Sequence, residues 1–348
     1  MPSTANPRSC GHRGAETERQ DVSARANPTA AAGSGGILSE GTVIRSTGSW
    51  YDVETSTGVV ACRVRGKFRL EASDETNPVV IGDQVEIRRE SDETGLIVGV
   101  HDRRNRIVRR AAGRRVGREH TIVANVDAAW IVQSVLLPKV NPGFIDRFIV
   151  MSTHYGIDVG IIVNKTDLIK DDFSEAIDYW TDLYRNLGFP VLRTSAVTGE
   201  GVDAVAARLA GRTSVFVGPS GVGKSTLLNR IEPGLGLRIG DVSARTGKGT
   251  HTTTHAELHQ LSFGGFVADT PGLREYGLVD IEPDMLSHYF VEFEPLAPEC
   301  RYPNCSHDHE PGCRVKEAIE NGEISAERYE SYLNMLFSLR QGEKDVGR

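Results

Sequence analysis

The sequence lacks any apolar run of about 18 residues, the length that a membrane-spanning helix needs. It also lacks the apolar core of a secretory signal, because its N-terminus is rich in Ala, Ser, Pro, Gly and charged residues. Excess positive charge is missing too, since the formal net charge at pH 7 is −7. We therefore expect a cytoplasmic protein without a membrane partner. The charge argues against a protein that coats nucleic acid indiscriminately.

Cysteine is scarce and unevenly distributed. Of five cysteines, three (Cys300, Cys305 and Cys313) fall within one short stretch that also contains His307. In a reducing compartment such a cluster indicates a metal site rather than a disulfide framework. Three thiolates and one imidazole suit tetrahedral Zn²⁺ with no open position, which predicts a structural ion. His309 is a nearby alternative ligand, and free thiols at chance spacing are the competing interpretation.

The 348 residues predict two or three domains, and a 39% hydrophobic content allows a sizeable core. Residues 1–36 contain few large apolar side chains, so we expect disorder there. Residues 37–105 contain five short β-rich runs separated by turn signals, which is typical of a small OB-type barrel. An SH3-like module would fit the same spacing. Residues 282–348 are predicted to be helical on both sides of the cysteine cluster.

Residues 106–281 alternate between predicted strands and helices. The strands are Val126–Val135, Val159–Val163, Val191–Thr194, Thr213–Val217, Ala256–Phe263 and Gly265–Ala268. The helices are Ile145–Thr153, Ser174–Leu187, Val202–Leu209 and one that begins at Lys224. This alternation predicts a multidomain α/β protein whose central domain is a parallel sheet with flanking helices.

Two features are compatible with RNA binding. Residues 101–120 hold eight arginines against Asp102 and Glu119, although charge runs usually form a solvated face. In the predicted barrel, Trp50 and Tyr51 could stack on bases, although burial in the core explains them equally well.

The strongest motif is the run from Gly218 to Ser225, GPSGVGKS, which matches G-x-x-x-x-G-K-[ST] between a predicted strand and helix. Glycines let the backbone approach phosphate oxygens, and the N–H groups then point at the anion. Lys224 is expected to reach the β- and γ-phosphates, and the Ser225 hydroxyl to bind Mg²⁺. The predicted contacts of this phosphate-binding loop (P-loop) are Gly218, Pro219, Ser220, Gly221, Val222, Gly223, Lys224, Ser225 and Thr226.

A second motif predicts the base. Asn164, Lys165, Thr166 and Asp167 follow a predicted buried strand, at the edge of the sheet where ligands bind. The Asp167 carboxylate can accept hydrogen bonds from both N1–H and the exocyclic amine of guanine, a donor pair that adenine lacks. Further along, Ser195 and Ala196 follow another strand and resemble a backbone clasp on the guanine carbonyl. Together with the P-loop, these residues predict GTP and GDP as ligands.

The Mg²⁺ ion has a further predicted ligand beyond the P-loop. Asp269 ends a predicted strand and would bind Mg²⁺ through water, while the Gly272 N–H would meet the γ-phosphate. The next residue is Leu273, where Ras-type enzymes place a glutamine that orients the attacking water. Catalysis must therefore come from elsewhere, or hydrolysis will be slow.

The polar stretch Arg245–His255, RTGKGTHTTTH, lies where the first switch segment of a GTPase belongs. One of Thr252 and Thr253 is expected to bind Mg²⁺ and sense the γ-phosphate. His251 is a candidate for orienting the attacking water, and an exposed loop histidine is the alternative interpretation.

The guanine motif precedes the P-loop, whereas an ordinary GTPase has the reverse order. With this order, the motifs at Asn164–Asp167, Gly218–Thr226, His251–Thr254 and Asp269–Gly272, and the Cys₃His set, the chain resembles the circularly permuted, small-subunit-dependent GTPases of bacterial ribosomes. The resemblance implies an OB barrel, a permuted GTPase domain and a zinc domain. It also implies late maturation of the 30S subunit, contact with 16S rRNA, stimulation by that subunit and catalysis by His251. The chain departs from the family in its acidic balance and its 36-residue N-terminal extension.

Two other functions compete with this reading. A small-molecule kinase is disfavoured because Asp167 specifies guanine. A nucleotide-gated RNA-binding scaffold with little turnover is compatible with Leu273. We expect a monomer.

Overall fold

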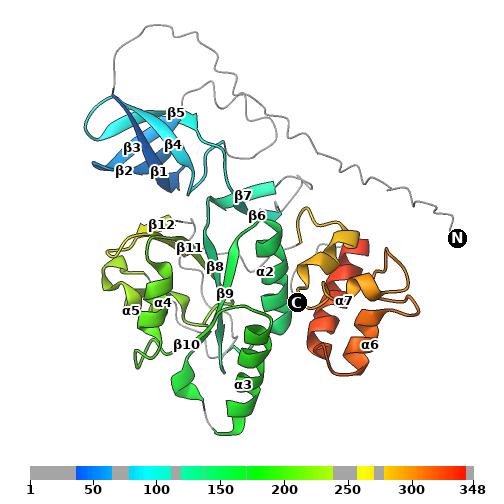
Figure 1. Ribbon diagram of the computed structural model, residues 1–348. Helices are drawn as coiled ribbons and strands as arrows, with labels where there is room; N and C mark the ends of the chain where they lie inside the picture. Colours follow the sequence, from blue (N-terminus) through cyan, green and yellow to red (C-terminus); the bar gives the residue numbers. More distant parts are fainter. Residues whose placement is uncertain are drawn as a thin grey trace, which may run out of the picture. The chain divides into compact units, whose positions relative to one another are not determined.

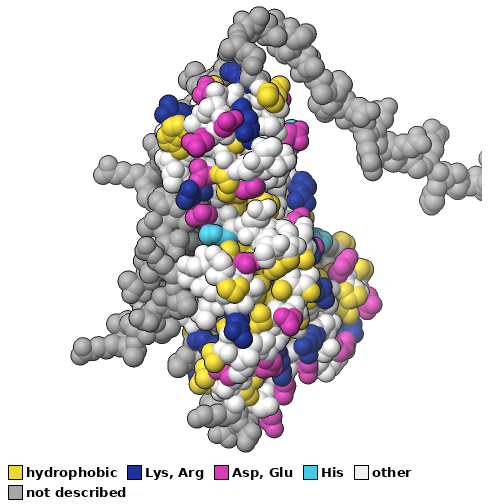
Figure 2. Space-filling view, turned by 90° about the vertical axis from the view of Figure 1, so that its left-hand side faces the viewer, with side chains coloured by type: hydrophobic (Ala, Val, Ile, Leu, Met, Phe, Trp, Pro, Cys, Tyr) yellow, Lys and Arg dark blue, Asp and Glu magenta, His cyan; other side chains and the backbone are white. Residues whose placement is uncertain are grey.

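The computed structural model describes residues 37–64, 78–110, 119–136, 138–169, 171–237, 257–269 and 278–341 (Figure 1). These residues belong to one unit, Gly36–Arg348. Residues 1–36, for which we expected disorder, lie outside the described ranges. Within those ranges, no helix combines the length and the apolar character needed to cross a membrane. On the face shown in Figure 2, the described Lys and Arg side chains are interspersed with Asp and Glu, in keeping with the modest net charge.

The N-terminal part is a closed five-stranded barrel. Its strands are β1 (Leu38–Thr47), β2 (Trp50–Thr55), β3 (Gly58–Val64), β4 (Gln84–Arg89) and β5 (Thr94–Val100). They pair in the order β1-β2-β3-β5-β4, and β4 pairs back with β1, which closes the small barrel that the sequence predicted. Alternate side chains fill the interior, among them Val43, Val53 and Ile87. Tyr51 belongs to this core, whereas the half-buried Trp50 lies on the other side of its strand with the Arg63 guanidinium 4.0 Å from the ring centroid.

The central sheet has five parallel strands and one antiparallel strand, through which it joins the first strand of the barrel. The parallel strands, in spatial order, are β10 (Val191–Thr194), β9 (Asp158–Asn164), β8 (Ala128–Ser134), β11 (Thr213–Val217) and β13 (Phe266–Asp269). The antiparallel strand β12 (Glu257–Gln260) pairs with β13 and, at Arg45 and Glu257, with β1 of the barrel. Five strands are parallel, as the sequence predicted, whereas β12 runs antiparallel and ends three residues earlier than expected. A tight turn at residues 261–265 explains both, because Gly264 and Gly265 take positive φ angles of 88° and 91°.

Helices cover both faces of this sheet (Figure 1). One face carries α2 (Pro142–His154) and α3 (Asp171–Asn186), and the other carries α4 (Val202–Leu209) and α5 (Lys224–Ile231). Successive β8 residues serve opposite faces: Ala129 and Ile131 pack in the same cluster as Phe148 of α2, while Trp130 packs with Val205 of α4. Every β8 residue is buried, which explains why its sequence is mostly apolar.

A short hairpin between the barrel and the sheet was not predicted. It consists of β6 (Arg106–Arg110) and β7 (Glu119–Ala124) and falls within the arginine-rich segment. Just before it, the Arg103 Nε lies 2.7 Å from the buried Asp83 carboxylate, and the Arg104 Nη2 lies 2.9 Å from Asp127. These two arginines therefore hold the local structure together. Residues 111–118 of the patch lie outside the described ranges.

The C-terminal part combines short turns with two α-helices. Its elements are the 3-10 helices η4 (Pro283–Tyr289) and η5 (Ala297–Glu299), followed by α6 (Arg314–Glu320) and α7 (Ala326–Gln341). The sequence predicts helices at Val315–Asn321 and Ala326–Arg340, and the two α-helices agree with these spans to within a residue. Helical character directly after Glu282 is of the 3-10 type, and the cysteine cluster lies between η5 and α6.

Candidate nucleotide-binding site and metal centre

The P-loop follows β11 directly and ends where α5 begins at Lys224. Two of its glycines are required by close contacts. A Cβ on Gly218 (φ 152°) would lie 2.2 Å from the Val132 carbonyl oxygen, and one on Gly223 (φ 93°) would lie 2.5 Å from the Asn164 Nδ2. The Lys224 ammonium folds back over the loop and donates to the Gly218 and Pro219 carbonyls at 2.8 and 3.0 Å. Ser225 and Thr226 stand in the first turn of α5, half-buried.

The guanine motif is held against the P-loop. The buried Asn164 donates from Nδ2 to the Val222 carbonyl at 2.9 Å, and its Oδ1 accepts from the Thr194 hydroxyl at 3.0 Å. Lys165 has a left-handed backbone (φ 67°), and its Nζ donates to the Gly221 carbonyl at 2.5 Å. Burial lowers the pKa of Lys165, while the nearby Asp167 opposes that shift. Asn164 and Val222, which are 58 positions apart in the sequence, are thus hydrogen-bonded to each other and form one wall of the site.

The loop that contains Ser195 holds the other side of the guanine motif. The buried Ser195 hydroxyl donates to the Asp167 Oδ1 at 2.5 Å, which fixes one carboxylate oxygen of the base-reading residue. Thr166 donates to the Glu200 carboxylate at 2.7 Å. Ala196 follows Ser195 and is half-buried. No role was predicted for Glu200 from the sequence. Only its position in the Thr-Gly-Glu-Gly run could have indicated one.

These three loops lie at one edge of the sheet. They follow β9, β10 and β11, which are parallel, so their carboxyl ends meet on the same side. Asp269 ends the parallel strand β13 at that edge, but its side chain is not described. His251, Thr252, Thr253 and Gly272 also lie outside the described residues.

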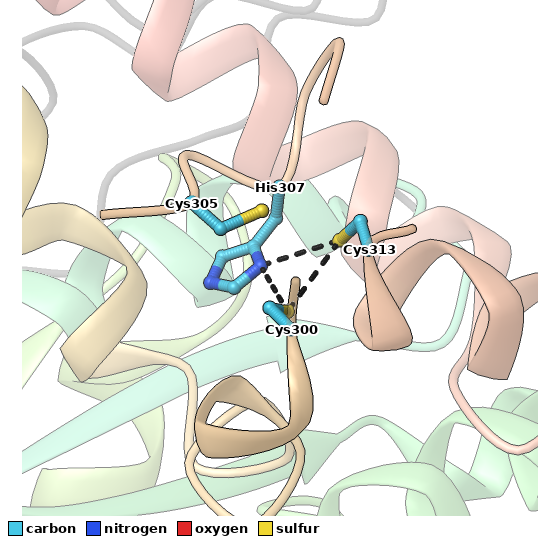
Figure 3. A group of neighbouring side chains, drawn as sticks. All are labelled: Cys300, Cys305, His307 and Cys313. Carbon is cyan, nitrogen blue, oxygen red and sulfur yellow. Dashed lines mark hydrogen bonds between the residues drawn. The ribbon is translucent and has the colours of Figure 1, made fainter. Parts of the chain in front are cut away.

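A second site gathers the four predicted metal ligands (Figure 3). The ligand atoms of Cys300, Cys305, His307 and Cys313 all lie within 4.8 Å of one another. The Cys300 and Cys313 sulfurs are 3.9 Å apart, and the His307 Nδ1 is 3.6 and 3.4 Å from them. This set could hold one metal ion. His309, the alternative ligand, is outside the group and 74% exposed, with its Nδ1 3.5 Å from Asp308.

Burial shapes the chemistry of these thiols. It raises the pKa of Cys305 to about 12 and also raises that of Cys313, with the neighbouring thiols contributing. Without a metal, Cys305 and Cys313 therefore keep their protons, and a bound cation must displace them.

The loop that carries His307 is fixed from several sides. Tyr329 donates to the His307 carbonyl at 2.8 Å, and Tyr332 donates to the Ser306 carbonyl at 2.6 Å. The Glu310 carboxylate accepts from the Ser306 amide and hydroxyl at 2.8 and 2.7 Å. Although burial opposes ionisation, these hydrogen bonds lower the pKa of Glu310 to about 2. The sequence analysis missed these supporting residues, because none belongs to the ligand pattern.

Comparison with known proteins identifies the family. The sequence profile of the RsgA GTPase family matches residues 100–279, and that of the RsgA N-terminal domain matches residues 40–97. The chain belongs to the RsgA GTPase family. As a member of this family it is a GTP hydrolase, which confirms the activity predicted from the motifs.

Relatives of this RsgA-family chain are similar over almost their whole length. "Small ribosomal subunit biogenesis GTPase RsgA" of Bacteroides fragilis is 41% identical over 304 residues, which cover 87% of this chain and 98% of that protein. The protein of the same name in Flavobacterium johnsoniae is 41% identical over 301 residues, covering 85% and 92%.

Two solved structures are also similar to this chain. YjeQ from Thermotoga maritima has 35% identity and a TM-score of 0.71, covering 90% of this chain and all of that one. YloQ, described as a circularly permuted GTPase, has 30% identity and a TM-score of 0.69, covering 88% and 96%. The permuted order and the barrel that were predicted from the sequence are thereby confirmed.

Proposed function

We propose that this protein binds the 30S ribosomal subunit, assists its late maturation and hydrolyses GTP to GDP and phosphate with stimulation by that subunit. The observation that carries the proposal is the hydrogen-bonded wall in which Asn164 and Lys165 hold the base-reading loop against the P-loop. This arrangement suits a guanine nucleotide whose base and phosphates are bound at one edge of the sheet. The small ribosomal subunit is proposed as the partner because the names of the relatives refer to it.

The roles of individual residues follow from the motifs and from this geometry. Lys224 would leave the P-loop carbonyls and bind the β- and γ-phosphates, as its reach across the loop supports. Ser225, Thr253 and Asp269 would hold Mg²⁺, which neutralises the phosphate charge when bound. His251 would orient the attacking water. Asp167 would read guanine with Ser195 and Ala196 beside it.

Zn²⁺ fits the Cys₃His group. Tetrahedral Zn²⁺ with sulfur at 2.3 Å and nitrogen at 2.0–2.1 Å places its ligand atoms about 3.8 Å (S–S) and about 3.6 Å (S–N) apart. The separations of 3.9, 3.6 and 3.4 Å among Cys300, His307 and Cys313 are close to these values, and the Cys305 sulfur lies within 4.8 Å of all three. With four protein ligands there is no open position, so the ion would be structural.

Partners and boundaries complete the proposal. The barrel and the zinc-binding part would contact 16S rRNA, and the protein would act as a monomer in the cytoplasm. The proposed domains are 37–105 for the barrel, 106–281 for the GTPase and 282–348 for the zinc-binding part, with residues 1–36 as an N-terminal extension. Leu273 keeps one alternative open, a nucleotide-gated RNA-binding scaffold with little turnover.

The test is GTP hydrolysis by the purified protein, alone and with 30S subunits, with ATP as the control nucleotide and Lys224→Ala as the control variant. We expect turnover of GTP only, increased strongly by 30S subunits and lost in the variant. Tight GTP binding without stimulation would favour the scaffold. Undiminished turnover by Lys224→Ala would contradict the P-loop assignment.

A further inference from the structure

Glu200 stands at a junction between the two loops that surround the guanine site. Its main-chain carbonyl accepts from the Ser195 amide at 3.0 Å, and its carboxylate accepts from the Thr166 hydroxyl at 2.7 Å. The first bond closes the Ser195 loop on itself. The second joins that loop to the guanine motif, one residue before Asp167. A single residue therefore links both loops.

The backbone directs the Glu200 side chain toward Thr166. Glycines flank it at positions 199 and 201, with φ angles of 91° and 68°. A Cβ on Gly201 would lie 2.0 Å from the Arg193 carbonyl oxygen, so the chain passes too close to β10 for any other residue there. The sharp turn that results presents Glu200 to the guanine motif. The geometry thus accounts for the glycines on both sides of Glu200 at positions 199 and 201.

The guanine motif needs this support because its own backbone is strained. Lys165 holds a left-handed conformation that non-glycine residues adopt rarely, and Thr166–Leu168 then form a single 3-10 turn. Asp167 lies in the middle of that turn. Ser195 fixes one of its carboxylate oxygens, but a hydrogen bond to one oxygen leaves rotation about that bond. Fixing Thr166 as well sets the turn, and with it the direction of the second oxygen.

We propose that Glu200 is a positioning residue for base recognition: by holding Thr166 it aims the Asp167 carboxylate at the guanine N1–H and amino group. This inference rests on the proposed guanine site. The hydrogen bond is charge-assisted and joins Thr166 to a carboxylate on a separate loop, so Glu200 can set the direction of Asp167 without contacting the base itself. Glu200 need not touch the phosphates, and its removal should leave the hydrolytic step unchanged.

The test compares the binding of GDP, inosine diphosphate and ADP by calorimetry. Glu200→Ala should weaken GDP binding by about three- to tenfold, the usual effect of losing one such hydrogen bond. Inosine diphosphate lacks the amino group and makes only one of the two bonds to Asp167, so its loss should be smaller. Glu200→Gln, which keeps an acceptor oxygen, should lose less than Glu200→Ala. The kcat for GTP should stay unchanged while KM rises.

Two sets of variants guard against indirect effects. Thr166→Val should match Glu200→Ala, Thr166→Ser should bind like the wild type, and the Glu200→Ala/Thr166→Val double variant should lose no more than either alone. Asp203→Ala removes an exposed carboxylate in the first turn of α4 and should bind GDP like the wild type. If Glu200→Ala does not fold, the Thr166→Val and Thr166→Ser pair tests the same bond.

Three results would overturn the inference: unchanged GDP affinity in Glu200→Ala and Thr166→Val, equal losses for the guanine and hypoxanthine nucleotides, or additive losses in the double variant. Failure of the proposed function would look different. In that case the wild-type protein itself would bind GDP no more tightly than ADP.

Discussion

The Arg328 Nη1 lies 2.6 Å from the Asp146 Oδ1, and the two side chains are only 1% and 0% exposed. Arg328 belongs to α7 and Asp146 to α2, so this pair joins the zinc-binding part to a helix of the nucleotide-binding sheet. Glu292 accepts two more hydrogen bonds from Arg328, at 2.7 and 3.0 Å. Tyr184 of α3 donates to the same Asp146 oxygen at 2.7 Å. The Arg328–Asp146 pair therefore connects α2, α3 and α7 with the segment that contains Glu292.

Removal of Arg328 should strongly destabilise this junction. Arg328→Met would leave Asp146 and Glu292 buried without a cation, which typically costs about 3–5 kcal/mol. Arg340→Met is the matched control, because Arg340 on the same helix pairs with Asp308 at a site 39% exposed and should cost under about 1 kcal/mol. Urea unfolding measures both. If both variants lost the same amount of unfolding free energy, the buried Arg328 junction would stabilise the fold no more than the exposed Arg340 pair.

Loss of the metal should unfold mainly the part of the chain after Glu282. The loop between Cys300 and Cys313 has little apolar core of its own, so metal binding is expected to supply much of its folding free energy. A chelator should lower the helical circular dichroism, and trypsin should then cut first after residue 282.

Two histidine variants sharpen this prediction. His307→Ala should abolish binding of one zinc ion per chain. His309 lies two residues away and its side chain is exposed, so His309→Ala should still bind the ion. Metal content by mass spectrometry decides between them. Zinc loss in the His309 variant, or proteolysis confined to residues 123–272, would contradict the assignment.

The sequence predicted those parts of the protein whose signal is local. The P-loop, the guanine motif and the cysteine cluster are each short runs whose residue types determine their chemistry, and the barrel strands show regular alternation. The β6–β7 hairpin was missed because arginines surround its buried Ile107 and Val108. The end of β12 was missed because the turn at residues 261–265 contains the apolar Leu261 and Phe263, which continue the pattern of the strand.

Long-range contacts gave no comparable signal. The Arg328–Asp146 pair spans 182 residues, and nothing in either segment marks the other as its partner. The bond between Asn164 and Val222 likewise depends on how β9 and β11 are placed in the sheet. Such contacts follow from the three-dimensional arrangement, which explains why the supporting residues of both sites became visible only in the structure.

Changing the base-reading carboxylate should change the nucleotide preference. Asp167→Asn replaces an acceptor with an amide whose NH₂ group faces the guanine donors, so GTP binding should weaken by about 100-fold, the effect of two hydrogen bonds to a charged group. Xanthosine triphosphate has a carbonyl in place of the amino group and should gain affinity. Calorimetry with both nucleotides measures the exchange. Asp182→Asn, at a 69% exposed carboxylate of α3, is the control and should bind GTP normally.

Stability should also depend on pH through His154, at the end of α2. Its Nδ1 lies 2.8 Å from the Tyr289 hydroxyl, and burial lowers its pKa from the usual 6.5, while the Asp280 carboxylate opposes that shift. A lowered pKa means that the folded protein binds this proton less readily than the unfolded chain. The contribution of neutral His154 to the free energy of unfolding is therefore complete above about pH 6.5, the pKa in the unfolded chain. It is lost as the pH falls toward the lower pKa of His154 in the folded protein.

The urea midpoint of wild type and His154→Gln, measured from about pH 7.5 down to about pH 5.5, tests this dependence. The wild-type midpoint should fall more steeply than that of the variant, because glutamine has no proton to gain. His101→Gln is the control, since His101 is 52% exposed and its removal should leave the wild-type slope. Parallel curves for wild type and His154→Gln would mean that protonation of His154 does not oppose folding. The contact with Tyr289 would then be equally compatible with both charge states.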